Sequence, residues 1–188
     1  MQYKNLILAS KSPRRKQLLE MAGIPFTIRT KEVEEDYPVD LPVMQVAPFL
    51  ARKKAQACRD FIEGDDILLS ADSVVIQGGI IYGKPVDRAD AKRILSILSG
   101  QMHTVVTGVC LLSKDKERIF AGHSQVFFDE LSEAEIDYYV DTYQPFDKAG
   151  AYAIQEWIGL CKINKIEGTY ANIMGLPVDM VYKELQAF

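Results

Sequence analysis

The sequence predicts a mixed α/β fold in a single domain covering residues 1–188. Patterns typical of strands and of helices alternate along the chain, and a β-hairpin pattern is inserted among them. The length of 188 residues fits one domain. Hydrophobic residues make up 48% of the chain and charged residues 26%, which allows a packed core without a disulfide or a metal. We therefore expect a mixed, twisted sheet with flanking helices.

The first part of the chain begins with a short apolar run, NLILA at residues 5–9, typical of a buried strand. Ser12 and Pro13 then predict a helix start, with a serine cap and proline at the first helical position, and Gly23 ends that helix. The other predicted elements are a strand over 26–29, a helix over 46–61, a long strand over 66–70 and 73–77, a turn at 78–79 and a return strand at 80–82.

The second part alternates in the same way. Ser132 followed by Glu135 predicts a capping box, and so a helix over residues 133–142. The other predicted elements are a helix over 87–99, a hairpin of strands 103–113 and 117–128, a short strand over 151–154, a mixed segment over 157–167, a turn opening at 170–174 and a helix over 177–187.

Charge and cysteine content restrict the possible functions. A net charge of −4 and a pI of about 5.3 argue against binding to a nucleic-acid backbone, which needs a broad basic face. A small anionic ligand stays possible, because a few convergent cations can dominate one cleft. Cys58, Cys110 and Cys161 form no metal-binding pattern, so we expect buried free thiols in a reducing compartment.

No apolar run approaches the roughly 18 residues that span a membrane. The short apolar run near the N-terminus precedes the cationic cluster, which is the reverse of the order in a signal peptide. We therefore expect a cytoplasmic protein that does not bind membranes.

The segment SKSPRR at residues 10–15 lies between a predicted strand and a predicted helix start. Free N–H groups and the positive end of the helix dipole favour an anion there. Two cations in the first turn, Arg14 and Arg15, are unfavourable for the helix alone, because they oppose its dipole. A phosphate chain bound between them and the helix end would explain their presence, since guanidinium groups bind phosphate oxygens well. The alternative is a solvated arginine pair on a surface helix. The glycine-rich phosphate loop GxxxxGK[ST] is absent from the sequence.

Asp72 lies between the two apolar halves of the long predicted strand. A carboxylate in such a place is costly to bury unless it is paired. It therefore binds a cation, accepts hydrogen bonds or acts as a base. The alternative is an aspartate at a bulge whose oxygens accept from backbone N–H groups.

Other charged residues border predicted elements: Glu34 and Glu35 follow the second strand, Lys54 is on the next helix and Lys84 follows the return strand. Taken singly, each is more often a solvated surface charge. If two carboxylates and two lysines converged, they would form a site for a divalent metal and a triphosphate.

The segment DKAGAYAIQ at residues 147–155 combines small residues with Gln155. Glycine allows the backbone to approach a ligand closely, and a glutamine amide offers the donor and acceptor needed to recognise a pyrimidine edge. The alternative is a glycine turn before an edge strand. His103 and His123 lack a neighbouring nucleophile, so we interpret them as structural or surface residues.

Several of these segments, in order, resemble the motifs of the Maf family of nucleoside triphosphate pyrophosphatases. The matching segments are LASKSPRRKQLL at 8–19, LARKKA at 50–55, ADSVV at 71–75, GKP at 83–85, SGQMH at 99–103, TGV at 107–109 and NIMGLP at 172–177. The segment at 147–155 resembles the subfamily that acts on dTTP and UTP, whereas the sister group acting on 7-methyl-GTP carries a different segment there. The resemblance implies a fold of two lobes around a deep cleft, similar to inosine triphosphate pyrophosphatases.

The resemblance also implies roles for individual residues. Asp72 would be the catalytic carboxylate and, with Glu35, a ligand of a divalent Mg or Mn ion, although Glu34 leaves that register uncertain by one. Lys54 and Lys84 match phosphate-facing lysines that also act in catalysis. The substrate-binding residues would be Ser10, Ser12, Arg14, Arg15, Ser73 and Gln155. Of these, Arg14, Ser73 and Gln155 match positions tied to base selection, and Ser73 replaces the family's usual threonine.

The implied reaction is hydrolysis of dTTP and UTP, and of some modified pyrimidine nucleotides, to the monophosphate and pyrophosphate, which prevents incorporation of non-standard nucleotides. The resemblance also implies a homodimer with a nucleotide substrate and no nucleic-acid partner. The alternative is a non-catalytic nucleotide-binding regulator of septum formation.

Overall fold

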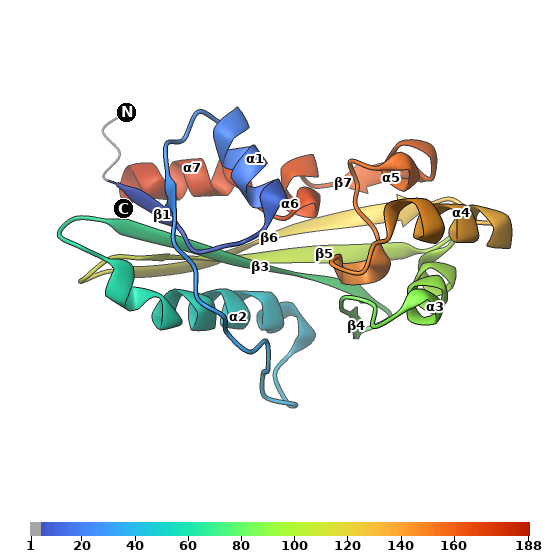
Figure 1. Ribbon diagram of the computed structural model, residues 1–188, viewed down its shortest axis with the longest axis horizontal. Helices are drawn as coiled ribbons and strands as arrows, with labels where there is room; N and C mark the ends of the chain where they lie inside the picture. Colours follow the sequence, from blue (N-terminus) through green and yellow to red (C-terminus); the bar gives the residue numbers. More distant parts are fainter. Residues whose placement is uncertain (1–4) are drawn as a thin grey trace. The chain divides into compact units, whose positions relative to one another are not determined.

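The computed structural model describes residues 5–188 and contains a mixed α/β fold, as predicted. Its sheet has the strand order β2-β1-β3-β5-β6-β7, and β4 pairs with β3 (Figure 1). The strands are β1 (Leu6–Leu8), β2 (Thr27–Ile28), β3 (Ile67–Gln77), β4 (Ile80–Tyr82), β5 (Met102–Leu112), β6 (Glu117–Phe128) and β7 (Ile163–Glu167). The helices are α1 (Pro13–Met21), α2 (Val43–Ala57), α3 (Arg88–Leu98), α4 (Glu133–Tyr143), α5 (Trp157–Cys161), α6 (Tyr170–Met174) and α7 (Val178–Ala187).

The chain divides into two compact units. The first contains residues up to 73, residues 107–122 and residues 175–188, and the second contains residues 74–106 and 123–174. Strands β3, β5 and β6 each contribute residues to both units. The two-lobe prediction agrees with this division, whereas the cleft stays a prediction, and so does the single domain over 1–188.

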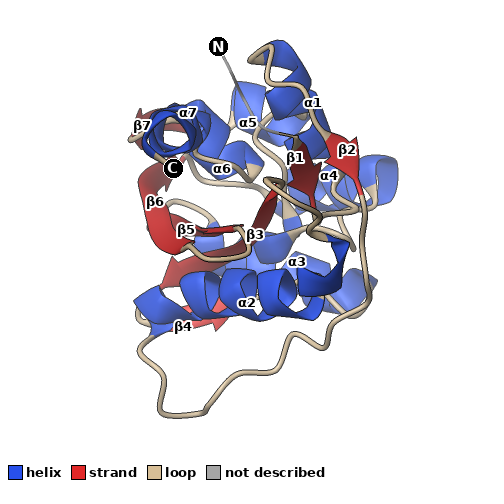
Figure 2. Ribbon diagram, turned by 90° about the vertical axis from the view of Figure 1, so that its left-hand side faces the viewer, coloured by secondary structure: helices blue, strands red, loops and turns tan. Residues whose placement is uncertain are grey.

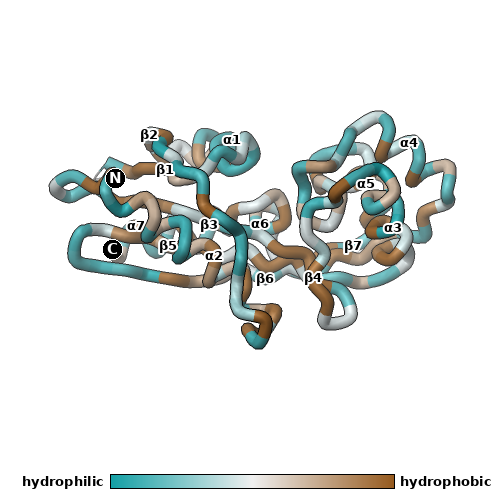
Figure 3. The backbone as a smooth tube through the Cα atoms, turned by 60° about the horizontal axis from the view of Figure 1, so that its bottom comes forward, coloured by the Kyte–Doolittle hydropathy of each residue, from teal (hydrophilic) through white to brown (hydrophobic). Residues whose placement is uncertain are grey.

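In the first unit, the parallel strands β2, β1 and β3 lie between helices. Leu6 pairs with Ile67 and Ile7 with Thr27. Helix α2 covers one face of these strands, and α1 and α7 lie on the other (Figures 1 and 2). The tube in Figure 3 is hydrophobic along β1 and hydrophilic at the start of α1. This contrast agrees with a buried strand that leads into a polar turn.

In the second unit, α3 and α4 pack on a core that includes Leu95, Val126 and Tyr139. Strand β4 pairs antiparallel with the end of β3, and β7 pairs antiparallel with β6. The predicted capping box of α4 is confirmed, because the Ser132 and Glu135 side chains each accept from the backbone N–H of the other residue.

Three local predictions need correction. The predicted strand over 151–154 is wrong: a 3₁₀ turn covers Ala149–Ala151, because Gly150 and Ala151 have φ angles of 70° and 58° that a strand does not allow. The turn predicted at 170–174 is the short helix α6. Ser12 occupies the N-cap position of α1, but its side chain makes no capping hydrogen bond.

Cys58 and Cys110 are buried free thiols, as predicted, whereas Cys161 is exposed, contrary to the prediction. Cys161 lies at the end of the short helix α5, where the chain turns into β7. Among residues 5–188, no helix is long and apolar enough to cross a membrane.

Both histidines agree with the prediction of structural or surface residues: His103 is buried and His123 is exposed. The His103 ring is 1% exposed, its Nε2 lies 2.8 Å from the Tyr152 hydroxyl oxygen, and it contacts Phe128 edge to face. Within the described part of the chain its Nδ1 has no hydrogen-bond partner. Burial lowers the pKa of His103 to about 4, because the charged imidazolium loses its hydration.

This pKa shift predicts a loss of stability in acid. The folded state keeps His103 neutral, whereas the unfolded chain binds its proton below a pH of about 6.5, so the contribution is complete above that pH and declines toward pH 4. We expect His103 to account for about 2 to 3 kcal/mol of the unfolding free energy lost between about pH 7.5 and 4.5. Urea unfolding at both pH values should show a smaller loss for His103→Gln. The control His123→Gln should match the wild type, and equal losses in all three proteins would contradict the prediction.

Candidate active site

The turn between β1 and α1 presents the Ser10 side chain beneath the start of the helix. Ala9 closes the parallel strand pair by donating its N–H to the Leu69 carbonyl at 2.8 Å. The Ser10 hydroxyl then accepts from the Ser12 N–H and from Arg15 Nη1, each at 3.2 Å. The sequence places these residues next to the helix start, and the side-chain oxygen fixes the shape of the turn.

The Arg15 guanidinium connects its own turn with two distant segments of the first unit, and Ser73 extends this network to a further strand. Its Nε donates to the Gly175 carbonyl at 2.8 Å, and its Nη2 donates to the Ser73 hydroxyl at 3.1 Å. Ser73 Oγ lies 2.9 Å from Oγ1 of the buried Thr107. A guanidinium offers donors in a rigid planar fork, so Arg15 holds the surrounding backbone in one geometry.

Two carboxylates, Asp72 and Glu35, act electrostatically on Arg15. Burial lowers the pKa of Arg15, Asp72 raises it, Arg14 lowers it and Glu35 raises it, in decreasing order of effect. Arginine stays charged despite such a shift. Arg15, the second of the two arginines that follow Pro13, therefore lies within electrostatic reach of Asp72 in β3.

Lys54 joins the two predicted acidic residues. Its Nζ donates to Glu35 Oε1 at 2.8 Å and also to Asp72 Oδ1. Asp72 is 8% exposed, so its charge needs this partner. In this geometry Glu35, and not Glu34, is the residue of the acidic pair that contacts Lys54.

Packing of α2 on the sheet places Lys54 beside Asp72. The Ser70 hydroxyl donates to the Ala51 carbonyl at 2.6 Å. A Cβ at Gly108 in β5 would lie 2.2 Å from the Pro48 nitrogen. The bare glycine thus lets the helix backbone touch the strand, and Pro48 has no N–H that this contact could leave unpaired.

The structure brings most of the predicted site residues together in the first unit. Ser10, Ser12, Arg15 and Ser73 share one hydrogen-bond network, and Glu35, Lys54 and Asp72 share another. Arg14 lies half-buried in the first turn of α1. The sequence assigned no role to Thr107, although it lies in the TGV motif, as a polar residue within a buried strand segment.

Lys84 and Gln155 belong to the second unit, and their sharing of one site with the first unit stays a prediction. Lys84 is exposed after β4, and Gln155 is half-buried before α5. The Gly150 N–H donates to the Gly83 carbonyl at 3.1 Å, so the backbone preceding Lys84 is tied to the segment that carries Gln155.

The carboxylates of Glu35 and Asp72, which both contact Lys54, fit a magnesium or manganese ion that also binds phosphate. The described residues contain no group of three His, Cys, Asp or Glu side chains that could hold an ion alone. Mg²⁺ commonly binds one or two carboxylates and takes its other ligands from substrate phosphates and water. The common contact of Glu35 and Asp72 with one ammonium group shows that a cation is accommodated between them.

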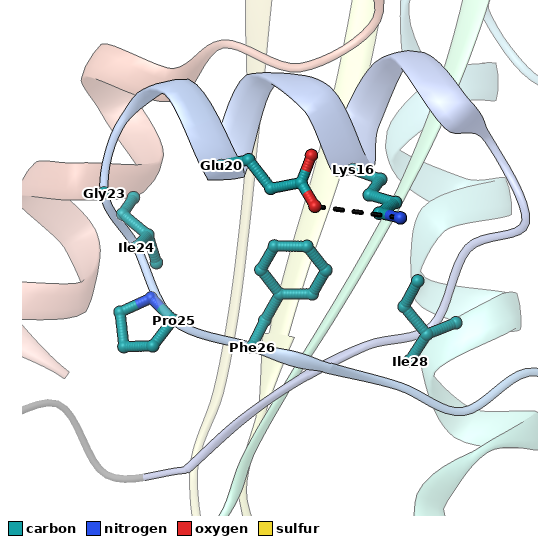
Figure 4. Close-up of a pocket in the computed structure, with 7 residues that line it drawn as sticks. All are labelled: Lys16, Glu20, Gly23, Ile24, Pro25, Phe26 and Ile28. Carbon is teal, nitrogen blue, oxygen red and sulfur yellow. Dashed lines mark ion pairs between the residues drawn. The ribbon is translucent and has the colours of Figure 1, made fainter.

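A separate hollow of about 640 Å³ lies between α1 and the chain leading into β2 (Figure 4). Its wall is mainly apolar, and Lys16 and Glu20 form an ion pair across 3.7 Å at its edge. The residues that line it are Lys16, Glu20, Gly23, Ile24, Pro25, Phe26 and Ile28. None of these seven residues is among the predicted site residues.

The first unit thus contains a polar site in which arginine, lysine, serine and carboxylate side chains meet where a parallel strand turns into a helix, the kind of site that binds phosphorylated anions. The family model described as Maf-like protein matches residues 5–188. The chain therefore belongs to the Maf family.

Two relatives named dTTP/UTP pyrophosphatase are similar over nearly the whole chain. The relative from Bacteroides thetaiotaomicron is 46% identical over 182 residues, which is 96% of this chain and 94% of the relative. The relative from Cytophaga hutchinsonii is 49% identical over 183 residues, which is 97% of this chain and 83% of the relative.

Among solved structures, the Staphylococcus aureus Ham1 protein overlaps 66% of this chain and 72% of its own, with 14% identity and a TM-score of 0.46. An overlap this weak carries no argument about fold or function.

Proposed function

We propose that this protein is a nucleoside triphosphate pyrophosphatase that hydrolyses dTTP and UTP to the monophosphate and pyrophosphate. The contact of Lys54 with both Glu35 and Asp72 carries the proposal, because it joins a buried carboxylate, a second carboxylate and a cation at one point. The names and high coverage of the two relatives support the choice of substrates.

Asp72 accepts a proton from the attacking water. The water oxygen forms a bond to the α-phosphorus, the bond from that phosphorus to the bridging oxygen breaks, and pyrophosphate leaves with its electron pair. Asp72 is buried in β3, which holds its carboxylate in one position, as general-base catalysis requires. A divalent metal ion held by Asp72 and Glu35, when bound, screens the negative charge of the phosphates.

Positively charged residues bind the triphosphate. Arg14, Lys54 and Lys84 face the phosphates, and Arg15 keeps Ser10 and Ser73 in place through hydrogen bonds. These groups stabilise the charge that develops on the leaving pyrophosphate. Catalysis then depends on positioning and electrostatics, with no covalent intermediate. We further propose a cytoplasmic homodimer that acts on free nucleotides, including modified pyrimidine nucleotides, so that non-standard nucleotides are not incorporated into nucleic acid.

Product analysis tests this proposal. We expect UTP with magnesium to give UMP and pyrophosphate on ion-exchange chromatography, and EDTA to stop the reaction. In a panel of the common triphosphates and 7-methyl-GTP, dTTP and UTP should be the best substrates. Release of orthophosphate and UDP would instead indicate a phosphatase. Binding of UTP without any product would support the alternative, a non-catalytic nucleotide-binding regulator of septum formation.

A further inference from the structure

The second unit buries a lysine immediately before the glycine turn. Lys148 is 7% exposed, and its Nζ lies 2.8 Å from Asp147 Oδ1 and 3.5 Å from Glu156 Oε1. An ammonium group is costly to remove from water unless carboxylates accompany it. Asp147 is mostly exposed, whereas the Glu156 side chain is only 20% exposed. Glu156 is therefore the partner that fixes Lys148 on its buried side.

Glu156 is also tied to helix α4 through Tyr139. The fully buried Tyr139 hydroxyl donates to Glu156 Oε2 and accepts from the Ala153 N–H at 3.1 Å. Burial raises the pKa of Tyr139, and the hydrogen bond to Glu156 raises it further, so the hydroxyl keeps its proton. One side chain of α4 (orange in Figure 1) thus holds the backbone at Ala153 and the side chain at Glu156.

Gln155 lies between these two attachment points. Within residues 5–188 its Oε1 is buried and has no hydrogen-bond partner. A buried acceptor without a donor is unfavourable, because it has lost its hydrogen bonds to water. A ligand that supplies an N–H would remove this penalty. The N3 position of uracil and thymine carries such an N–H, whereas N3 of cytosine is itself an acceptor.

The backbone leading to Gln155 is strained. Ala151 has a φ of 58°, which is unfavourable for a residue with a Cβ. Such a conformation persists only where the surrounding contacts hold it. The hydrogen bond from Ala153 to Tyr139 and the ion pair of Lys148 with Glu156 are contacts of this kind.

We propose that Tyr139, Glu156 and Lys148 are positioning residues that hold Gln155 in the conformation that selects uracil and thymine over cytosine. The inference rests on the proposed function, because Gln155 has to meet the base of the substrate. The three residues act through the segment at 153–156 and do not touch the reacting phosphates. Their loss should therefore affect base selection and KM more than kcat.

The test is the ratio of kcat/KM for UTP to kcat/KM for CTP in Tyr139→Phe, which removes only the hydroxyl. We expect this ratio to fall about tenfold, through a higher KM for UTP at nearly unchanged kcat, as suits the loss of one hydrogen bond to a charged group. The control Tyr138→Phe removes a hydroxyl from the exposed side of the same helix and should leave the ratio unchanged. A variant of lower thermal stability that keeps the wild-type ratio would overturn the proposal.

A second pair of variants covers failure of Tyr139→Phe to fold. Glu156→Ala removes the acceptor of the Tyr139 hydroxyl, whereas Glu156→Gln keeps an oxygen there. The proposal expects the UTP-to-CTP ratio to fall in Glu156→Ala and to recover largely in Glu156→Gln. Equal ratios in these two variants would contradict it.

Binding separates this inference from the proposed function. If the wild-type protein does not turn over UTP, the proposed function fails. The preference for UTP over CTP is then measured as the ratio of their dissociation constants, by calorimetry on the full chain. A wild-type preference for UTP that Tyr139→Phe reduces would still support the positioning role. Equal affinities of the wild-type protein for UTP and CTP, or no binding of either, would overturn it.

Discussion

Replacing Asp72 with asparagine is expected to lower kcat for UTP hydrolysis by about 10² to 10⁴-fold, the usual contribution of a positioned general base. Asparagine has the shape of aspartate but cannot accept the proton of the attacking water, and it is a weaker metal ligand. Lys54 keeps its contact with Glu35 at 2.8 Å, so the local structure should persist. Nucleotide binding should stay nearly intact, because the phosphate-binding cations remain.

Steady-state kinetics and calorimetric binding of UTP together test this prediction. The matched control is Asp40→Asn, which removes a carboxylate from the exposed loop before α2 and should leave kcat unchanged. Turnover close to that of the wild type in Asp72→Asn would refute the assignment of Asp72. Loss of turnover together with loss of binding would show that Asp72 binds the nucleotide and does not act as the general base of the reaction.

The second large effect is expected from Gly108→Ala. The added Cβ would lie 2.2 Å from the Pro48 nitrogen and 2.3 Å from the Ala47 carbonyl carbon. Both atoms belong to the backbone of α2, so no side-chain rotation can relieve the overlap. We expect the unfolding free energy to fall by about 3 kcal/mol or more, at the upper end of overpacking effects.

Gly108→Ala should also reduce activity in the fraction that stays folded, because α2 carries Lys54 and a shift of this helix moves Nζ away from Asp72. Urea unfolding and the rate of UTP hydrolysis measure the two effects. Gly83→Ala is the control for stability, since a Cβ there has no other atom within 4 Å. An unchanged unfolding midpoint in Gly108→Ala would show that α2 does not pack against β5 as described.

Local patterns predicted most elements of the fold because their causes act over a few residues. The Ser132 and Glu135 pair predicted the start of α4, and Pro13 predicted the first residue of α1. The prediction of a strand at 151–154 was wrong, because an apolar run suggests a strand but does not indicate the positive φ angles of Gly150 and Ala151.

The candidate site was predicted in part. Asp72 was identified from its unusual place between apolar strand halves. Glu35 and Lys54 were candidates only if they converged with other charges, and the resemblance to known motifs gave them their roles. Thr107 was overlooked because a threonine in a strand is ordinary, and its contact with Ser73 spans 34 positions. Spacing along the chain contains no signal for a contact of this kind.

By itself, the sequence determined most of the strands and helices, the acidic charge of the chain and the polar turn between β1 and α1. Capping, propensity and apolar periodicity depend on neighbouring residues, so they can be read directly from the chain. Only the tertiary structure decided that Lys54 contacts both Glu35 and Asp72, and that Arg15 reaches Gly175, 160 positions away. These contacts depend on how helices pack on the sheet, as α2 does at Gly108, and that packing is fixed by side-chain volume in three dimensions.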